Sequence, residues 1–120
     1  MNGLRVLAVD DQQEILDVVQ LALEVTTDWS LTTRRSTASA VAEHDGTSYD
    51  VVLLDLNIPG EDAAESVSSL RGHDIAPSIV LLTGSPVSDA ERSRVAPDAV
   101  LTKPFDPMTL AAQIEAALTA

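Results

Sequence analysis

The sequence predicts one α/β domain over residues 1–120, built as a doubly wound five-stranded parallel sheet with helices on both faces. Five short apolar runs alternate with five stretches whose apolar residues recur at helical spacing. The third run, residues 51–54, is apolar without alternation, which is typical of a strand buried on both faces. Such alternation in so short a chain favours parallel strands joined by helices.

The first half of the chain contains two strands and two helices. The first strand is predicted over residues 4–9, which are apolar except for Arg5, and a helix follows over residues 12–25. Residues 29–34 alternate only weakly, which is typical of an exposed strand near a sheet edge, and a short helix is expected over residues 37–44. The inward face of the first helix is predicted to hold Ile15, Val18, Val19, Ala22 and Leu23.

In the second half, strands are predicted over residues 50–54, 78–83 and 99–102, and a helix over residues 62–70. The inward face of that helix is predicted to hold Ala63, Val67 and Leu70.

Two further helices carry capping signals. Ser88 stands three residues before Glu91, the spacing of a capping box, and this short helix is expected to stop before Pro97. Asp106-Pro107 places a capping residue before a proline at the predicted first position of the last helix. That helix would continue through Leu110, Ile114 and Leu118.

The composition fits a small domain that does not bind nucleic acid or membranes. Hydrophobic residues make up 45% of the chain and aromatic residues only 2%, so the core must consist of Val, Leu, Ile and Ala. The absence of cysteine excludes disulfides and cysteine-ligated metal sites. A net charge of -12 would repel phosphates, so direct binding to nucleic acid by this domain is not expected. No signal peptide or apolar run of about 20 residues is visible, so a cytoplasmic location is expected.

Four of the five predicted strand ends carry polar residues that could form one site. Asp10 and Asp11 follow the first strand, Asp55 follows the third, Thr83 ends the fourth, and Lys103 follows the fifth. Because the carboxyl ends of parallel strands meet at one edge of the sheet, these side chains are expected to share one pocket. The sequence therefore predicts three carboxylates, a hydroxyl and an ammonium at this edge.

This combination of groups suits phosphoryl transfer. Two carboxylates about 4 Å apart repel each other by about 4 kcal/mol at an effective dielectric constant near 20, so three would need a cation. An all-oxygen site suits Mg²⁺, with Mn²⁺ as a possible substitute. Asp55 can accept a phosphoryl group as an acyl phosphate, while the metal and Lys103 neutralise the negative charge of the phosphoryl group. Thr83 can donate a hydrogen bond to a phosphoryl oxygen.

At these positions the chain resembles the receiver domain of bacterial two-component response regulators. The resemblance rests on Asp10-Asp11, Asp55, Thr83 and Lys103-Pro104-Phe105, and it extends over essentially the whole chain. It implies a flavodoxin-like (βα)5 fold. It also implies that Asp55 receives a phosphoryl group from a phosphohistidine of a histidine kinase or a histidine phosphotransfer protein. Such a domain is a switch rather than an enzyme, and it catalyses only its own phosphorylation and autodephosphorylation.

The resemblance also assigns roles to single residues. Asp11 and Asp55 would bind Mg²⁺ through their carboxylates, Asp10 would act mostly through water, and Asn57 would offer its backbone carbonyl. Thr83 and Lys103 would hold the phosphoryl oxygens.

Supporting roles follow from the same resemblance. Gly84 would leave room for the phosphoryl group, and a cis peptide before Pro104 would fix the direction of Lys103. The lifetime of the phosphoryl group would depend on Asn57 and Ser85, which flank the position of an attacking water.

Two positions and one interval depart from the family pattern. Val100 stands where an aromatic residue usually reports the switch, so altered coupling to the output is expected with the phosphorylation chemistry intact. Ala63 replaces a usual glycine, so residue 63 need not have a positive φ. The interval from Thr83 to Lys103 is about two residues shorter than is typical of the family, so the helix between them should be short or displaced.

Two other functions stay open from the sequence. A degenerate receiver would bind a partner without being phosphorylated. A small Mg²⁺-dependent phosphohydrolase of the haloacid dehalogenase type also uses an aspartate at a strand end, but it wants a second aspartate where this chain has Asn57. The output partner, or an output domain outside this sequence, is not determined.

Overall fold

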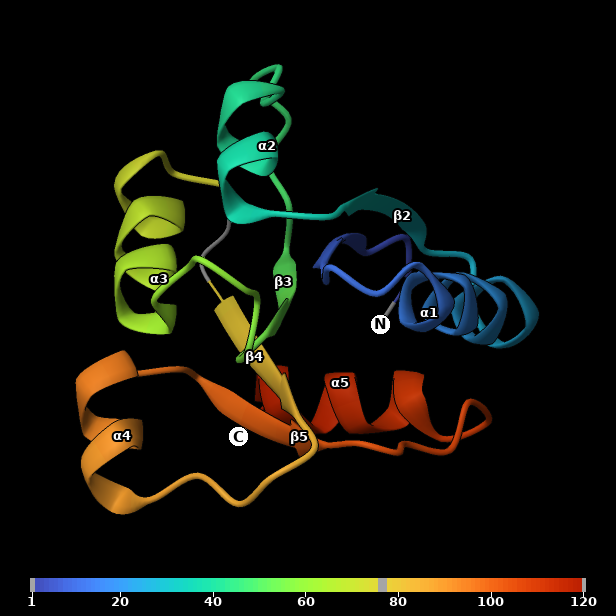
Figure 1. Ribbon diagram of the computed structural model, residues 1–120. Coiled ribbons are helices and arrows are strands. Elements are labelled where there is room, and N and C mark those ends of the chain that lie inside the picture. The colour runs from blue at the N-terminus through green and yellow to red at the C-terminus, as the bar shows by residue number, and fades with distance from the viewer. Residues whose placement is uncertain (1, 76–77, 120) are drawn as a thin grey trace.

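A computed structural model describes residues 2–75 and 78–119 and shows strands and helices alternating along the chain (Figure 1). The elements are β1 (Arg5–Val9), α1 (Gln13–Thr26), β2 (Ser30–Arg34), α2 (Thr37–Ala42), β3 (Val51–Asp55), α3 (Ala63–Gly72), β4 (Ser78–Thr83), α4 (Asp89–Val95), β5 (Ala99–Thr102) and α5 (Leu110–Thr119).

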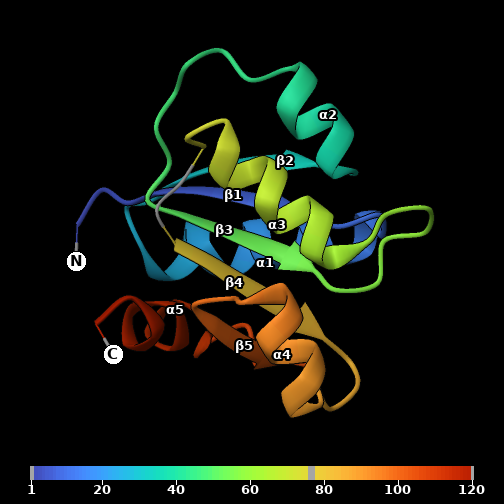
Figure 2. The same cartoon turned by 90° about the vertical axis from the view of Figure 1, so that its left-hand side faces the viewer.

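The strands form one parallel sheet in the order β2-β1-β3-β4-β5. Helices α1 and α5 cover one face of the sheet, and α2, α3 and α4 cover the other (Figures 1 and 2). The predicted doubly wound (βα)5 fold is therefore confirmed, and the weakly alternating strand β2 lies at an edge as expected. Among the described residues, no helix has the length and apolar character needed to span a membrane.

Alternate side chains of the strands enter two cores, one on each face of the sheet. In β3, Val51 and Leu53 pack toward α1 and α5, while Val52 and Leu54 pack toward α2, α3 and α4. Both faces of β3 are thus buried, which explains why its sequence is continuously apolar. The inward residues predicted for α3 are also confirmed, since Ala63, Val67 and Leu70 are all buried there.

The inward face predicted for α1 is partly wrong. Val18 is 38% exposed, whereas Leu16, which was not assigned to that face, is 2% exposed. The buried face of α1 consists of Leu16, Val19, Ala22 and Leu23. Val18 instead joins Leu21 and Val25 in an exposed apolar row on the same helix.

The last helix begins three residues later than predicted, although the Asp106 carboxylate accepts the kind of hydrogen bond expected of a capping residue. The Asp106 carboxylate accepts a hydrogen bond from the Met108 N–H at 2.9 Å, and the Asp106 carbonyl accepts one from the Thr109 N–H at 3.0 Å. These bonds form a turn over residues 106–109 that leads directly into α5, which begins at Leu110. Most other ends differ from the prediction by one or two residues, and β4 and β5 match it.

The cap predicted for α4 is confirmed. Ser88 is the N-cap, and its hydroxyl accepts a hydrogen bond from the Glu91 N–H at 3.1 Å. The helix has 7 residues and ends at Val95, and its C-cap Ala96 adopts the left-handed conformation just before Pro97. The expectation of a short helix between Thr83 and Lys103 therefore holds.

Candidate functional site

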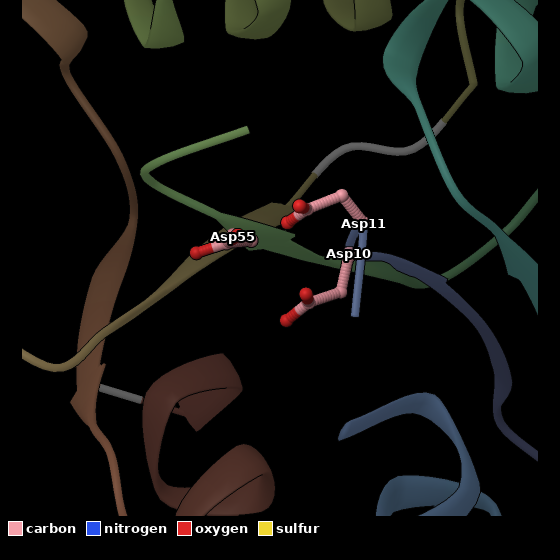
Figure 3. A group of neighbouring side chains, drawn as sticks. All are labelled: Asp10, Asp11 and Asp55. Carbon is pink, nitrogen blue, oxygen red and sulfur yellow. The ribbon is translucent and has the colours of Figure 1, made fainter. Parts of the chain in front are cut away.

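The strand ends bring three carboxylates together at the carboxyl edge of the sheet. Asp10 and Asp11 follow β1, and Asp55 is the last residue of the neighbouring strand β3. One oxygen from each carboxylate lies within 4.8 Å of the other two. Figure 3 shows the three side chains leaving the two adjacent strand ends. The predicted acidic cluster is thus present in the structure.

Lys103 supplies positive charge to this cluster. Its Nζ donates hydrogen bonds to Asp10 Oδ2 at 2.9 Å and to Asp55 Oδ1 at 3.3 Å. The Asp10 side chain is 1% exposed, that of Asp55 7% and that of Lys103 16%. Burial lowers the pKa of Lys103, but the hydrogen bond and charge of Asp10, with the charge of Asp55, outweigh it and raise that pKa. Lys103 therefore stays protonated and compensates two buried carboxylates.

The environment of Asp55 disfavours its ionised form. Burial, followed by the charge of Asp10, raises the pKa of Asp55 above its usual value. The Asn57 N–H, which donates to Asp55 Oδ1 at 3.2 Å, and the Lys103 ammonium oppose this change. Ionised Asp55 is thus a carboxylate whose charge is only partly compensated by the protein's own groups.

We expect Asp55→Asn to raise the free energy of unfolding by about 1 kcal/mol at pH 7 in magnesium-free buffer, because it removes a repelled buried charge. Because the folded-state pKa of Asp55 is raised, protonation of Asp55 stabilises the folded wild type below the unfolded-state pKa of about 3.9. This stabilisation is lost as pH rises through the folded-state pKa. The gain of the variant should therefore be small below about pH 4 and grow above it. Urea unfolding at several pH values measures this, and an equal difference at all pH values would contradict it.

Asp10 is held by the turn that follows β1. Its N–H donates to the Arg34 carbonyl at 3.1 Å, and its Oδ1 accepts from the Gln12 N–H at 2.9 Å. The N-cap of α1 is Gln12, which has no side-chain capping hydrogen bond. Asp10 therefore shapes the turn before α1 while its other oxygen contacts Lys103.

Thr83 lies at the same edge but does not direct its hydroxyl at Asp55. Its Oγ1 donates to the Ser85 carbonyl at 2.9 Å and accepts from the Ser85 N–H at 3.1 Å. The side chain can donate to a phosphoryl oxygen only after it gives up the Ser85 carbonyl. Gly84 leaves space here, since a methyl group on it would meet no atom within 4 Å.

The remaining predicted residues lie on or shortly after β3 and β5. The Lys103–Pro104 peptide is cis, and the Lys103 N–H donates to the Thr83 carbonyl at 2.7 Å. Asn57 is exposed beside Asp55. Val100 is half-buried on the edge strand β5, packed against the core under α2, α3 and α4.

Sequence reasoning missed one residue at this edge. The Arg35 guanidinium donates from Nε at 3.2 Å and from Nη2 at 2.5 Å to the main-chain carbonyl of Asp11. Arg35 directly follows β2, the one strand whose carboxyl end was not considered as part of the pocket. Because β2 pairs with β1 in parallel, that strand end lies at the same edge and could have identified Arg35.

The donor set fits Mg²⁺. Asp10, Asp11 and Asp55 offer only oxygen ligands, and the spread of their oxygens is close to the roughly 4.2 Å that separates opposite ligands of a Mg²⁺ ion. Nitrogen or sulfur ligands, which would favour zinc, do not belong to the cluster.

The chain is similar to known proteins over most of its length. A family model described as the response regulator receiver domain matches residues 6–115. The transcriptional regulatory protein YvrH of Bacillus subtilis is 31% identical over 121 residues, which cover 98% of this chain and 50% of YvrH. The phosphate regulon regulatory protein PhoB of Pseudomonas aeruginosa is 30% identical, covering 98% of this chain and 53% of PhoB. This chain thus spans about half the length of these curated relatives.

Solved structures agree with the sequence relatives. The chemotaxis response regulator CheY4 of Vibrio cholerae superposes with a TM-score of 0.84 at 27% identity, covering 97% of this chain and 99% of CheY4. The match extends over the sheet and its helices, which places the acidic edge described above within a shared fold. The chain therefore belongs to the response regulator receiver domain family of two-component systems.

Proposed function

We propose that this domain accepts a phosphoryl group on Asp55 from a phosphohistidine, in a reaction that requires Mg²⁺. The observation that carries the proposal is the convergence of the Asp10, Asp11 and Asp55 oxygens, with Lys103 bonded to two of them. Asp55 is the strongest candidate nucleophile, because it ends the central strand β3 and contacts the ammonium.

The transfer exchanges one bond to phosphorus for another. An Asp55 carboxylate oxygen forms the O–P bond while the N–P bond to histidine breaks, and its electron pair stays on the imidazole nitrogen, which then takes up a proton. Bound Mg²⁺ would neutralise the charge on the transferring group, held by Asp11, Asp55, the Asn57 carbonyl and, through water, Asp10. Lys103 would move its ammonium from Asp55 Oδ1 to a phosphoryl oxygen.

The domain would pass this change on to an output partner. The relatives that it matches over half their length are transcriptional regulators, so we propose that residues 1–120 act as a receiver unit for such an output. The phosphodonor would be a cytoplasmic histidine kinase or phosphotransfer protein. The net charge of -12 argues that nucleic acid is not bound by the receiver itself. Once its hydroxyl is released from the Ser85 carbonyl, Thr83 would contact the phosphoryl group. Val100, which replaces the usual aromatic residue, would alter how this change is passed to the output partner.

Binding of beryllofluoride, which mimics a phosphoryl group, tests the proposal. The amide resonances of Asn57 and Gly84 are the reporters. The fluorescence of Trp29 would be less direct, because Trp29 precedes β2 at the opposite edge of the sheet. Wild type is expected to show new resonances only with Mg²⁺, and Asp55→Asn is expected to show none. Asp74→Asn, the same substitution at an exposed site after α3, is the control and should behave as wild type.

The alternatives predict different results in the same experiment. A folded wild-type protein that binds no beryllofluoride would support the degenerate receiver and contradict the proposal. Steady release of phosphate from small phosphomonoesters, abolished by Asp55→Asn, would support a phosphohydrolase. The position of Asn57 argues against that reaction, because its amide cannot serve as the general acid and base.

A further inference from the structure

Arg35 connects the loop after β2 to the acidic pair after β1. Its side chain reaches a residue 24 positions earlier in the sequence, and two of its nitrogens donate to the same Asp11 carbonyl oxygen. One residue before, the Asp10 N–H donates to the Arg34 carbonyl. The two strand ends are therefore joined by a main-chain hydrogen bond at Asp10 and a side-chain contact at Asp11.

Asp11 depends on this contact more than Asp10 does. Asp10 is fixed through its N–H and both carboxylate oxygens, by Arg34, Gln12 and Lys103. The Asp11 carbonyl lies one residue before Gln12, whose carbonyl accepts the first hydrogen bonds of α1. It therefore stands outside the helical hydrogen-bond pattern, and the Arg35 guanidinium takes the place of a helical donor.

We propose that Arg35 is a positioning residue for divalent-cation binding, which it supports by fixing the backbone of Asp11. The orientation of the Asp11 carbonyl sets the peptide plane that follows its Cα. Holding that plane limits the directions in which the half-buried carboxylate can point and keeps it beside Asp10 and Asp55. The inference rests on the proposed function, because the cation is the Mg²⁺ of the phosphorylation site.

Charge and geometry make opposite predictions for this residue. Arg35 is a cation near a cation site, so removal of its charge alone would tighten Mg²⁺ binding. Loss of a contact that positions a metal ligand would weaken it. The direction of the change therefore separates a positioning residue from one that merely adds charge.

The test is a Mg²⁺ titration of the whole chain, followed by the amide resonances of Gln12 and Asn57. Arg35→Met removes the donors and the charge, and we expect about fivefold weaker binding. Arg35→Lys keeps the charge but not the planar pair of donors, so its affinity should fall between those of Arg35→Met and wild type. In Mg²⁺-free protein, the Asp11 amide resonance should also broaden in Arg35→Met, a readout that requires no metal.

Arg34→Met is the matched control, because it removes the same charge from the preceding residue, whose guanidinium pairs with Glu43 at 3.0 Å. The substitution keeps the Arg34 main-chain carbonyl, which is the Arg34 group that holds Asp10. Its Mg²⁺ affinity should equal that of wild type or exceed it slightly. If Arg35→Met binds Mg²⁺ as tightly as wild type or more tightly, the role of Arg35 is overturned and the proposed function stands. If the folded wild type does not bind Mg²⁺, both are overturned.

Discussion

Lys103→Met is expected to lower the free energy of unfolding by about 3 kcal/mol in magnesium-free buffer. The substitution keeps most of the apolar stem but leaves Asp10 and Asp55 buried without the ammonium that bonds both of them. Removing one partner of a buried ion pair costs more than the pair contributes, because the other charge stays desolvated. Urea denaturation, followed by the fluorescence of the buried Trp29 and by circular dichroism, measures the loss.

The variant should recover stability when its acidic charge is reduced or matched. Asp10→Asn in the Lys103→Met background should restore more than half of the loss, since one uncompensated carboxylate is removed. Mg²⁺ should stabilise Lys103→Met more than wild type, because the cation replaces the missing charge. Phosphorylation of Asp55 should nevertheless remain low, since the ammonium that would contact the phosphoryl oxygen is gone.

The pH dependence gives an independent test of the same contact. The raised pKa of Lys103 means that its contribution to stability is present below about pH 10.4, the unfolded-state pKa, and is lost as pH rises through the folded-state pKa. Wild type should lose this contribution at alkaline pH, and Lys103→Met should lack that loss. If Lys103→Met is as stable as wild type at pH 7, the ammonium does not compensate the buried carboxylates.

The residues of the pocket could be predicted because topology decides where they meet. Four positions in different parts of the chain, Asp10, Asp55, Thr83 and Lys103, end or follow strands of one parallel sheet. Once the strands are recognised from their apolar runs, a shared edge follows without knowledge of any side-chain conformation. The central strands are the most reliable part of such a prediction, because burial on both faces leaves a continuous apolar signal.

Side-chain directions could not be predicted in the same way. The Thr83 hydroxyl bonds the Ser85 backbone, a local contact that competes with any ligand and leaves no mark in the sequence pattern. Arg35 was not predicted as part of the site, because it follows the edge strand β2, whose hydrophobic pattern is weak. The position of Arg35 beside Asp11 also depends on a long side chain reaching across the loop.

The predictions of helix boundaries and inward faces were wrong where a local sequence signal is compatible with two structures. Asp106 followed by Pro107 is typical both of the first turn of a helix and of a non-helical turn, and residues 106–109 form a turn that leads into α5 at Leu110. In α1, apolar residues occupy so much of the surface that spacing alone allows more than one inward face. Leu16 and Val18 are both apolar, and only the packing against the sheet decides between them.

The burial of Leu16 rather than Val18 should have a measurable effect on the free energy of unfolding. Leu16→Ala is expected to lower the free energy of unfolding by about 3 kcal/mol, because Leu16 is buried in the core between the sheet, α1 and α5. Val18→Ala is the matched control on the same helix and should change it by about 0.5 kcal/mol or less, since Ala favours helix and Val18 is exposed. Urea denaturation measures both. A larger loss for Val18→Ala than for Leu16→Ala would show that α1 presents the predicted face, with Val18 inward. That result, or equal losses for the two variants, would contradict the packing described here.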